Sequence, residues 1–283
     1  MGYIVVQGFL LSGLYALIAV GFTMIFSVGR VLNLAYGVYI MLGGYAYYFA
    51  AQVLGMPKTV AFLFAVLTGI SFGVLTYLVL VKRLQHDPIA VEISTLILAV
   101  VMQSLVILVF SAAPKSMWPL IPGALHYEDL SITNNILLAM VVSWVVLGGL
   151  VLFVHKTHIG RAIRAVSMDR KGAIVSGIDP QRINLITWAI SGALGAIAGV
   201  FLATYTQLTP DMWVAPLIIA VAVVIVGGIG SIIGSLVAAH IIGFMETITT
   251  TLITPELRGV FTMLLIITVL VAAPKGLFGK EDL

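Results

Sequence analysis

Residues 213–252 read WVAPLIIAVAVVIVGGIGSIIGSLVAAHIIGFMETITTTL, and this stretch decides the class of protein. Its two apolar runs, 213–229 and 231–252, are close to the length of about 20 residues that crosses a bilayer as a helix. A cluster of glycines from Gly227 to Gly234 separates them, and such a cluster does not sustain a regular helix cheaply. The stretch therefore predicts two membrane-spanning segments with a glycine-rich break between them.

Similar apolar runs recur from one end of the chain to the other. Strands of a membrane barrel would be about half as long and would alternate polar and apolar residues, which these runs do not do. We predict an all-α, polytopic integral membrane protein with eight or nine transmembrane segments, one or two of them glycine-broken, in a single domain over residues 1–283. The predicted segments are 3–28, 31–53, 59–81, 95–113, 134–154, 184–206, 213–229, 231–252 and 258–273.

The composition supports this class and excludes several others. Of the 283 residues, 61% are hydrophobic and 9% are charged, whereas a soluble domain carries about 25% charged residues. The chain has no cysteine, which excludes disulfides, thiolate metal ligands and a cysteine nucleophile. No H-E-x-x-H motif occurs, and we expect no catalytic site, metal or bound cofactor. The net charge of +3 indicates basic cytoplasmic loops rather than nucleic-acid binding.

Two predicted segments are doubtful as full spans. Segment 31–53 contains Gly37, Gly43 and Gly44, and segment 213–229 runs into the glycine cluster. Backbone that leaves the helix at membrane depth must line a cavity or pack inside the protein. We therefore expect a broken or re-entrant segment at either place.

Lysines and arginines set the orientation. With the 82–94 loop, the 155–183 loop and the C-terminus on one side, eleven basic residues lie there and three on the other side. Cytoplasmic loops carry the excess of basic residues. Nine spans then place the N-terminus outside and the C-terminus in the cytoplasm. The eleven are Arg30, Lys82, Arg83, Lys156, Arg161, Arg164, Arg170, Lys171, Arg182, Lys275 and Lys280; the three are Lys58, Lys115 and Arg258.

The cytoplasmic loop over about 156–182 is predicted to contain a short amphipathic helix. Apolar residues fall near one helical face and basic residues near another. Gly177 suits a left-handed helix cap, and Asp179-Pro180 is typical of the start of the next helix. The helix either lies on anionic lipid or docks a cytoplasmic partner. No G-x-x-x-x-G-K-[ST] motif occurs, so a transporter driven by ATP would need such a docking element.

The chain resembles the permeases of branched-chain amino-acid ABC importers, the Liv type, over essentially its whole length. The N-terminal signature is similar to that of the H-type permease rather than of its M-type partner. The stretches that carry the resemblance, besides the basic loop Thr157–Pro180, are Arg30-Val31-Leu32-Asn33-Leu34-Ala35-Tyr36-Gly37 with Met41-Leu42-Gly43-Gly44-Tyr45, Glu92-Ile93-Ser94-Thr95-Leu96-Ile97-Leu98 with Gln103, the glycine cluster Val226–Ser235, and Pro274-Lys275-Gly276-Leu277-Phe278-Gly279.

The resemblance implies a multi-pass permease of the inner membrane that binds no cofactor itself. It implies a second homologous permease of the M-type, two cytoplasmic ATP-binding subunits that use the ATP, and a periplasmic substrate-binding protein. Three positions depart from the family pattern: Val38 replaces a frequent glutamate, Pro216-Leu217-Ile218 stands near a frequent lysine, and Ala273 replaces the usual arginine. The family also takes urea, short amides and carboxylates, so the substrate class expected is branched-chain amino acids or a related small polar or carboxylate compound.

Polar groups at membrane depth are costly, so each invites a functional hypothesis. Asn33 and Tyr36 either line the pathway or satisfy backbone groups freed by a break, and Gln103 either contacts substrate or bridges helices. We interpret His240 and Glu246 as structural. The residues predicted along the substrate pathway are Asn33, Tyr36, Gly37, Gln103, Gly227 and Gly228; those predicted to couple to the ATPase are Ile159, Gly160, Arg161, Ile163, Arg164, Val166 and Asp169.

A second function class stays open at this point. Discontinuous helices also build the sites of secondary transporters driven by an ion gradient. Such a transporter needs intramembrane carboxylates or sodium-coordinating backbone, and Glu246 is the only carboxylate clearly inside a predicted span.

Overall fold

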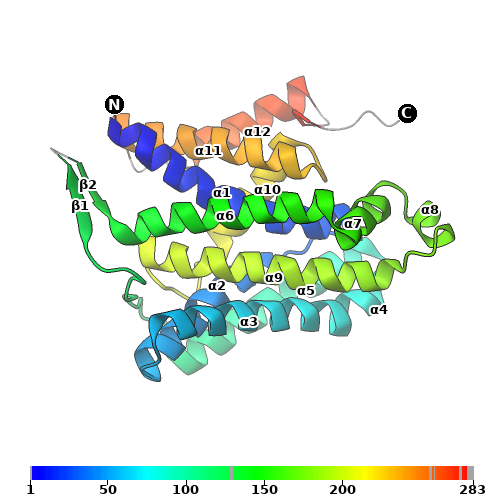
Figure 1. Cartoon of the computed structure of the whole chain (residues 1–283), viewed down its shortest axis with the longest axis horizontal. Helices are drawn as coiled ribbons and strands as arrows, with labels where there is room; N and C mark the ends of the chain where they lie inside the picture. The colour runs from blue at the N-terminus through cyan, green and yellow to red at the C-terminus, as the bar shows by residue number, and fades with distance from the viewer. Residues whose placement is uncertain (1, 128–129, 255–256, 258, 274–275, 279–283) are drawn as a thin grey trace.

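The computed structural model describes residues 2–127, 130–254, 257, 259–273 and 276–278. Its helices run mostly along the long axis of the molecule, as Figure 1 shows. A two-stranded hairpin lies at one end, and two short helices, α7 (His158–Met168) and α8 (Arg170–Val175), lie at the other. We call these the hairpin end and the α7 end.

Each of the nine predicted segments corresponds to an apolar helix in the described part of the chain. The all-α, polytopic class is therefore confirmed. The helices are α1 (Gly2–Gly29), α2 (Tyr36–Tyr48) continued by the π-helical turn η1 (Phe49–Val53), α3 (Lys58–Thr76) continued by η2 (Tyr77–Val81) and α4 (Lys82–Leu84), α5 (Pro88–Phe110), α6 (Asn134–Lys156), α9 (Pro180–Tyr205), α10 (Val214–Gly227), α11 (Ile232–Leu252) and α12 (Val260–Ala272).

Six of these helices are long and apolar enough to cross a membrane. They are Ile4–Gly29, Lys58–Leu84, Pro88–Phe110, Asn134–Lys156, Pro180–Tyr205 and Ile232–Leu252. Two more apolar helices, Val214–Gly227 and Val260–Ala272, are shorter. A helix of 14 residues such as α10 extends about 21 Å, which is less than the roughly 30 Å of hydrocarbon in a bilayer.

Helix starts follow the capping chemistry of the sequence. The Asp179 side chain accepts a hydrogen bond from the Gln181 amide at 2.9 Å, and Pro180 is the first residue of α9. The N-cap and proline start predicted for this helix is therefore confirmed. Asp87 starts α5 in the same way, with its carboxylate 3.1 Å from the Ala90 amide. Such caps satisfy amide groups that have no partner inside the helix.

The centre of the bundle is formed by α1 and α9. The apolar windows of these two spans are 83% and 72% buried inside the protein, against 17% for each of α5 and α6. Small residues let the central helices approach closely. A Cβ atom on Gly192 of α9 would meet the backbone carbonyl of Gly69 of α3, and a Cβ atom on Gly69 would meet the carbonyl of Gly192. Helices α5 and α6 therefore lie at the periphery, where most of their surface is free for lipid or for another protein.

One element was not predicted from the sequence. The connection 114–133 contains an antiparallel hairpin of β1 (Ala124–Tyr127) and β2 (Leu130–Thr133), in which Leu125 lies opposite Ile132. Residues 128–129, between the two strands, lie outside the described residues. The strands are too short to give an alternation that stands out from an irregular loop.

Candidate functional site

Helix α2 begins in the interior of the bundle. After α1 ends at Gly29, the chain is not helical again until Tyr36. A Cβ atom on Gly195 would lie 2.9 Å from the Cβ of Tyr39, so the start of α2 lies beside Gly195. That glycine is roughly 22 Å along α9 from Pro180, more than halfway up the helix. Segment 31–53 is thus a short helix that starts at mid-depth.

Helix α10 begins at the same place. A Cβ atom on Gly37 would meet the backbone carbonyl of Trp213, the residue before α10. From there α2 runs to the hairpin end, where the Tyr47 hydroxyl donates to the Trp118 carbonyl at 3.3 Å. Helix α10 runs to the α7 end. Two short helices therefore point away from each other with adjacent N-termini, and each N-terminus carries a partial positive charge.

Polar side chains from α5 and from the start of α2 surround this place. The Trp213 indole donates to the Gln103 carbonyl oxygen at 2.8 Å. The Asn33 side chain accepts from the Ala35 amide at 3.1 Å and donates to the Tyr39 hydroxyl at 3.0 Å. We call Asn33, Tyr36, Gly37, Gln103 and Trp213 the mid-depth junction. Four of its five residues were predicted; Trp213 was missed, because only the fold shows that α10 starts at this depth.

The side chain of Tyr36 lies inside the chain. It is fully buried, packs edge-on against Phe22 and Tyr39 at 5.7 Å, and reaches the backbone of α1 at Gly21. Its hydroxyl has no hydrogen-bond partner among the described residues. Asn33 is also buried, with 1% of its surface exposed. Both residues therefore support the start of α2 from within.

Gly227 and Gly228 lie away from the junction, at the other end of α10. A Cβ atom on Gly227 would lie 2.5 Å from the backbone carbonyl carbon of Gly234 in α11. Gly228 has a φ of +98°, which ends α10 and starts the turn into α11. The predicted pathway residues thus fall in two places about 20 Å apart along α10. The glycine cluster is a tight connection between two helices at the α7 end.

The C-terminal tail packs on this connection. The amides of Leu277 and Phe278 donate to the carbonyls of Val226 and Gly227 at 2.8 and 3.2 Å. These are carbonyls of the last turn of α10, which have no partner inside the helix. The backbone of Gly276, with a φ of +80°, lies directly against Gly228. Residues 276–278, which the sequence showed only as part of a motif similar to that of the family, therefore have a structural role: they hold the end of α10.

Helix α7 is amphipathic, as predicted. It begins at the N-cap Thr157, whose hydroxyl accepts from the Gly160 amide at 3.0 Å. Ile163 and Val166 are buried, at 2% and 3% exposed, against the chain's own helices, whereas Ile159 is 42% exposed. The expectation that the face of Ile163 and Val166 is offered to a partner is therefore corrected: it anchors α7 to the spans. Periodicity shows which residues share a face, but not what covers that face.

The other residues of the predicted coupling segment have distinct positions. Arg161 and Arg164 are exposed on the outer side of α7. Gly160 lies so close to the end of α6 that a Cβ atom would be 2.5 Å from the Cα of Val154. Asp169 separates α7 from α8 and caps α8, accepting from the Lys171 amide at 2.9 Å.

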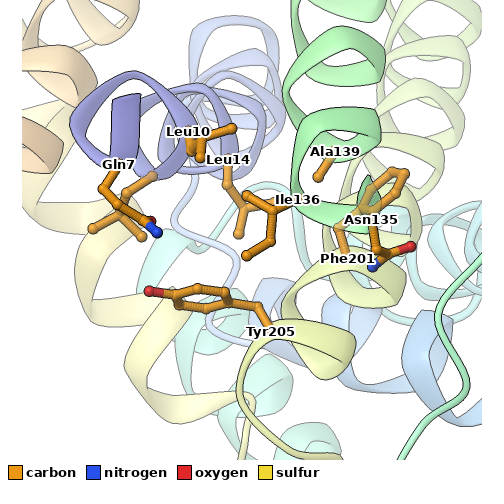
Figure 2. A pocket seen from close by; sticks show the side chains of 9 residues that line it. Gln7, Leu10, Leu14, Asn135, Ile136, Ala139, Phe201 and Tyr205 are labelled. Carbon is orange, nitrogen blue, oxygen red and sulfur yellow. The ribbon is translucent and has the colours of Figure 1, made fainter. Parts of the chain in front are cut away.

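Two cavities near the hairpin end contain none of the predicted pathway residues. Figure 2 shows the first, of about 30 Å³, which Gln7, Asn135 and Tyr205 line together with apolar side chains. A cavity of this size has room for only a few water molecules. The second is an apolar groove of about 570 Å³ between α1, α6 and the hairpin, lined by residues such as Phe9 and Trp144.

The polar residues of α11 are held by neighbouring groups. The Tyr15 hydroxyl donates to the Glu246 carboxylate at 2.5 Å, and both side chains are buried. One ring nitrogen of His240 lies 2.7 Å from the Leu236 carbonyl, and the ring packs against Trp144 with centroids 5.0 Å apart. Within the described residues, no group of three or more acidic or histidine side chains could hold a metal ion.

Comparison with known proteins gives matches over nearly the whole chain. The family model described as branched-chain amino acid transport system / permease component matches residues 4–270. The chain is 28% identical to the high-affinity branched-chain amino acid transport system permease protein BraD of Pseudomonas aeruginosa, covering 98% of this chain and 95% of that protein. It is 27% identical to the permease protein LivH of Escherichia coli K12, covering 98% and 94%.

A sugar permease is also among the relatives. The chain is 30% identical to the fructose import permease protein FruF of Bifidobacterium longum, covering 93% of this chain and 76% of that protein. No solved structure matches the chain. The match to the family model and the relatives of full length show that this multi-pass membrane protein belongs to the branched-chain amino acid ABC transporter permease family, as a permease component that is not itself catalytic.

Proposed function

We propose that this chain imports branched-chain amino acids, or a related small polar or carboxylate compound, as one domain over residues 1–283. In this proposal it works with a second homologous permease of the M-type, two cytoplasmic ATP-binding subunits and a periplasmic substrate-binding protein, and it binds no cofactor itself. The observation that carries the proposal is the similarity over nearly full length to BraD and LivH, whose names give this substrate class and this role. The fructose permease is the reason to test sugars as well.

The proposed orientation places the α7 end in the cytoplasm and the N-terminus outside. Its support is the split of eleven basic residues against three. All basic residues of α7 and α8 lie at the α7 end, whereas Lys58 donates to the Pro119 carbonyl in the connection that carries the hairpin, and Lys115 belongs to the same connection. Arg258, Lys275 and Lys280 lie outside the described residues.

A thiol-labelling experiment tests this orientation, and the absence of native cysteine makes it clean. We expect Ser116→Cys to react with an impermeant maleimide on intact cells and Val175→Cys to react only after the cells are opened. Ser116 is exposed and Val175, the last residue of α8, is 90% exposed, so both thiols are accessible to the reagent. Labelling of Val175→Cys but not of Ser116→Cys on intact cells would invert the orientation.

The mid-depth junction is the place where we propose that substrate passes. Short helices whose N-termini meet at membrane depth present partial positive charge, which suits the carboxylate of an amino acid. Gln103 adds a side-chain amide at this place, and Asn33 holds the start of α2 beside it. The pathway also needs a second wall. Helix α5, whose apolar window is only 17% buried, leaves its outer face free to pack against a second permease.

The outer surface of α7 is the part that we propose to contact an ATP-binding subunit. It consists of Ile159, Arg161, Arg164 and Met168, which combine exposed apolar area with charges that orient a partner. Ile163 and Val166 fix the helix to the spans, so a push on α7 acts on the bundle. If the same helix instead lies on the lipid surface, each arginine contributes about 1 kcal/mol of attraction to the membrane. Loss of one arginine would then have little effect on a protein that is already embedded in the bilayer.

Reconstitution of the complex tests the function and the role of α7 together. We expect a complex purified through a tag on this chain to import radiolabelled L-leucine into vesicles in an ATP-dependent way when its binding protein is present. Arg164→Glu should lose most of the stimulated ATP hydrolysis, because a reversed charge at the contact opposes binding. The matched control is Arg182→Glu, an exposed arginine near the N-terminus of α9, where a negative charge is favourable.

Three outcomes contradict parts of this proposal. Unchanged assembly and stimulation in Arg164→Glu would return α7 to the lipid-surface interpretation. ATP-dependent uptake of ribose or fructose without uptake of leucine, isoleucine or valine would replace the substrate class. Uptake driven by a proton or sodium gradient without ATP would favour the secondary transporter, for which Glu246 would be the first carboxylate to replace.

A further inference from the structure

Two arginines join the α7–α8 segment to the connections that precede α2 and α5. The guanidinium of Arg30 donates through Nη2 to the Ser167 carbonyl at 3.0 Å. The guanidinium of Arg170 donates through Nη2 to the Gln85 side-chain oxygen at 3.2 Å. One bond therefore reaches the connection between α1 and α2, and the other the connection between α4 and α5.

The backbone of Arg30 does not explain why an arginine stands there. Arg30 follows the last residue of α1 with a φ of +54°, and its amide donates to the Phe26 carbonyl at 2.9 Å. This left-handed helix end favours glycine, and an arginine adopts it at a cost. Ser167 belongs to the last turn of α7, where free carbonyls and the helix dipole favour a cation. The hydrogen bond of the Arg30 side chain to Ser167, rather than the conformation of the backbone, therefore explains why an arginine stands at this position.

The connection after Arg30 leads directly to the mid-depth junction. Residues 31–35 are not helical, and they end at the start of α2 with Tyr36 and Gly37. The Leu34 amide donates to the Thr95 hydroxyl of α5 at 3.1 Å. Only a few non-helical residues therefore separate Arg30 from the junction.

The connection after Gln85 leads to the other side of the same junction. Asp87 caps α5, and α5 carries Thr95, which holds Leu34, and Gln103, which holds Trp213. Helix α5 is 17% buried, whereas α1 and α9 are mostly buried. A peripheral helix with little buried surface moves more easily than the central pair.

We propose that Arg30 and Arg170 are positioning residues that transmit movement of the α7–α8 segment to α2 and α5, and so change the mid-depth junction. This inference rests on the proposed function, because it needs an ATP-binding partner that moves α7. Arg30 acts on the start of α2 through residues 31–35. Arg170 acts on the start of α5 through Gln85. The two sides of the junction then move together whenever the segment moves.

The same contacts contribute little to folding, which makes the idea testable. Both hydrogen bonds are exposed to solvent, where such contacts have small net effects on stability. Arg30→Gly also places the favoured residue in the left-handed conformation. A loss of transport in this variant would therefore not come from misfolding.

The experiment compares Arg30→Gly, Arg170→Gln and the double variant in the reconstituted complex. Arg30→Lys serves as the conservative variant. The matched control is Lys171→Gln, the neighbour of Arg170, whose exposed side chain makes no hydrogen bond to the described residues. The measurements are co-purification of the ATP-binding partner, its rate of ATP hydrolysis, the thermal midpoint, and the L-leucine imported per ATP hydrolysed.

We expect assembly, thermal midpoint and ATP hydrolysis to stay close to wild type, while leucine imported per ATP falls about fivefold or more in the single variants and further in the double variant. Arg30→Lys should recover part of the loss and Lys171→Gln should show none. A ratio within about twofold of wild type in both single variants would overturn the inference. If another solute stimulates ATP hydrolysis, only the proposed substrate changes, and the amount of that solute imported per ATP is measured instead. If no ATP-hydrolysing partner co-purifies, the coupling function and this inference fall together.

Discussion

Gly192→Leu is expected to remove most of the folded protein from the membrane fraction. A Cβ atom at this position would meet the backbone carbonyl of Gly69 and would lie 2.8 Å from its carbonyl carbon. Both obstacles belong to the backbone of α3, which cannot rotate away as a side chain can. Overpacking of a dense contact costs typically about 3 kcal/mol at the upper end, and more where backbone must shift. The thermal midpoint in detergent should fall by roughly 10 °C or more.

Gly148→Leu is the matched control for this prediction. Gly148 lies in the span α6, and no atom lies within 4 Å of the Cβ position there. The same change of residue at the same kind of helix position should therefore leave the thermal midpoint within a few degrees of wild type. Equal behaviour of the two variants would show that α3 and α9 do not pack as closely as the structure has them.

The fold could be predicted from the sequence to a large extent. Hydropathy located the nine apolar helices of the described residues, because a bilayer demands apolar runs of a certain length. Capping chemistry located the start of α9 at Asp179 and Pro180, since both residues act on adjacent backbone. The two segments rich in glycine, 31–53 and 213–229, both contain short helices that start at mid-depth, but Gly37, Gly43 and Gly44 lie inside α2 without breaking it, and the glycine cluster begins at the end of α10.

The contacts that build the junction could not be predicted in the same way. Gln103 and Trp213 are 110 positions apart in the chain, and nothing local in either region specifies the other. The depth at which α2 and α10 begin could not be predicted either, because hydropathy counts apolar residues without saying where in the bilayer a helix begins. The covering of α7 was missed for a related reason: Ile163 and Val166 lie on α7, which packs against α1 as well as α6 and α9, and α1 is distant from α7 in the sequence.

The role of Gln103 can be separated from a purely structural one by a double replacement. The Gln103 carbonyl oxygen accepts from the indole of Trp213 at 2.8 Å, and Trp213 is 7% exposed. Gln103→Leu alone leaves the indole N–H without this partner, which should lower the free energy of unfolding by about 1–3 kcal/mol. Adding Trp213→Phe removes the N–H as well, and replacing both partners by apolar groups is close to neutral.

Uptake should not follow stability in this pair of variants. If Gln103 also contacts the substrate, loss of that hydrogen bond is worth about 1.4 kcal/mol, so leucine uptake should fall about tenfold in Gln103→Leu and stay low when Trp213→Phe restores stability. Trp213→Phe alone keeps the glutamine and should lose much less uptake. Recovery of both stability and uptake in the double variant would show that Gln103 only bridges α5 to the start of α10. In that case the pathway would be lined by other groups of the junction, and the backbone amides at the two helix N-termini would be the next to test.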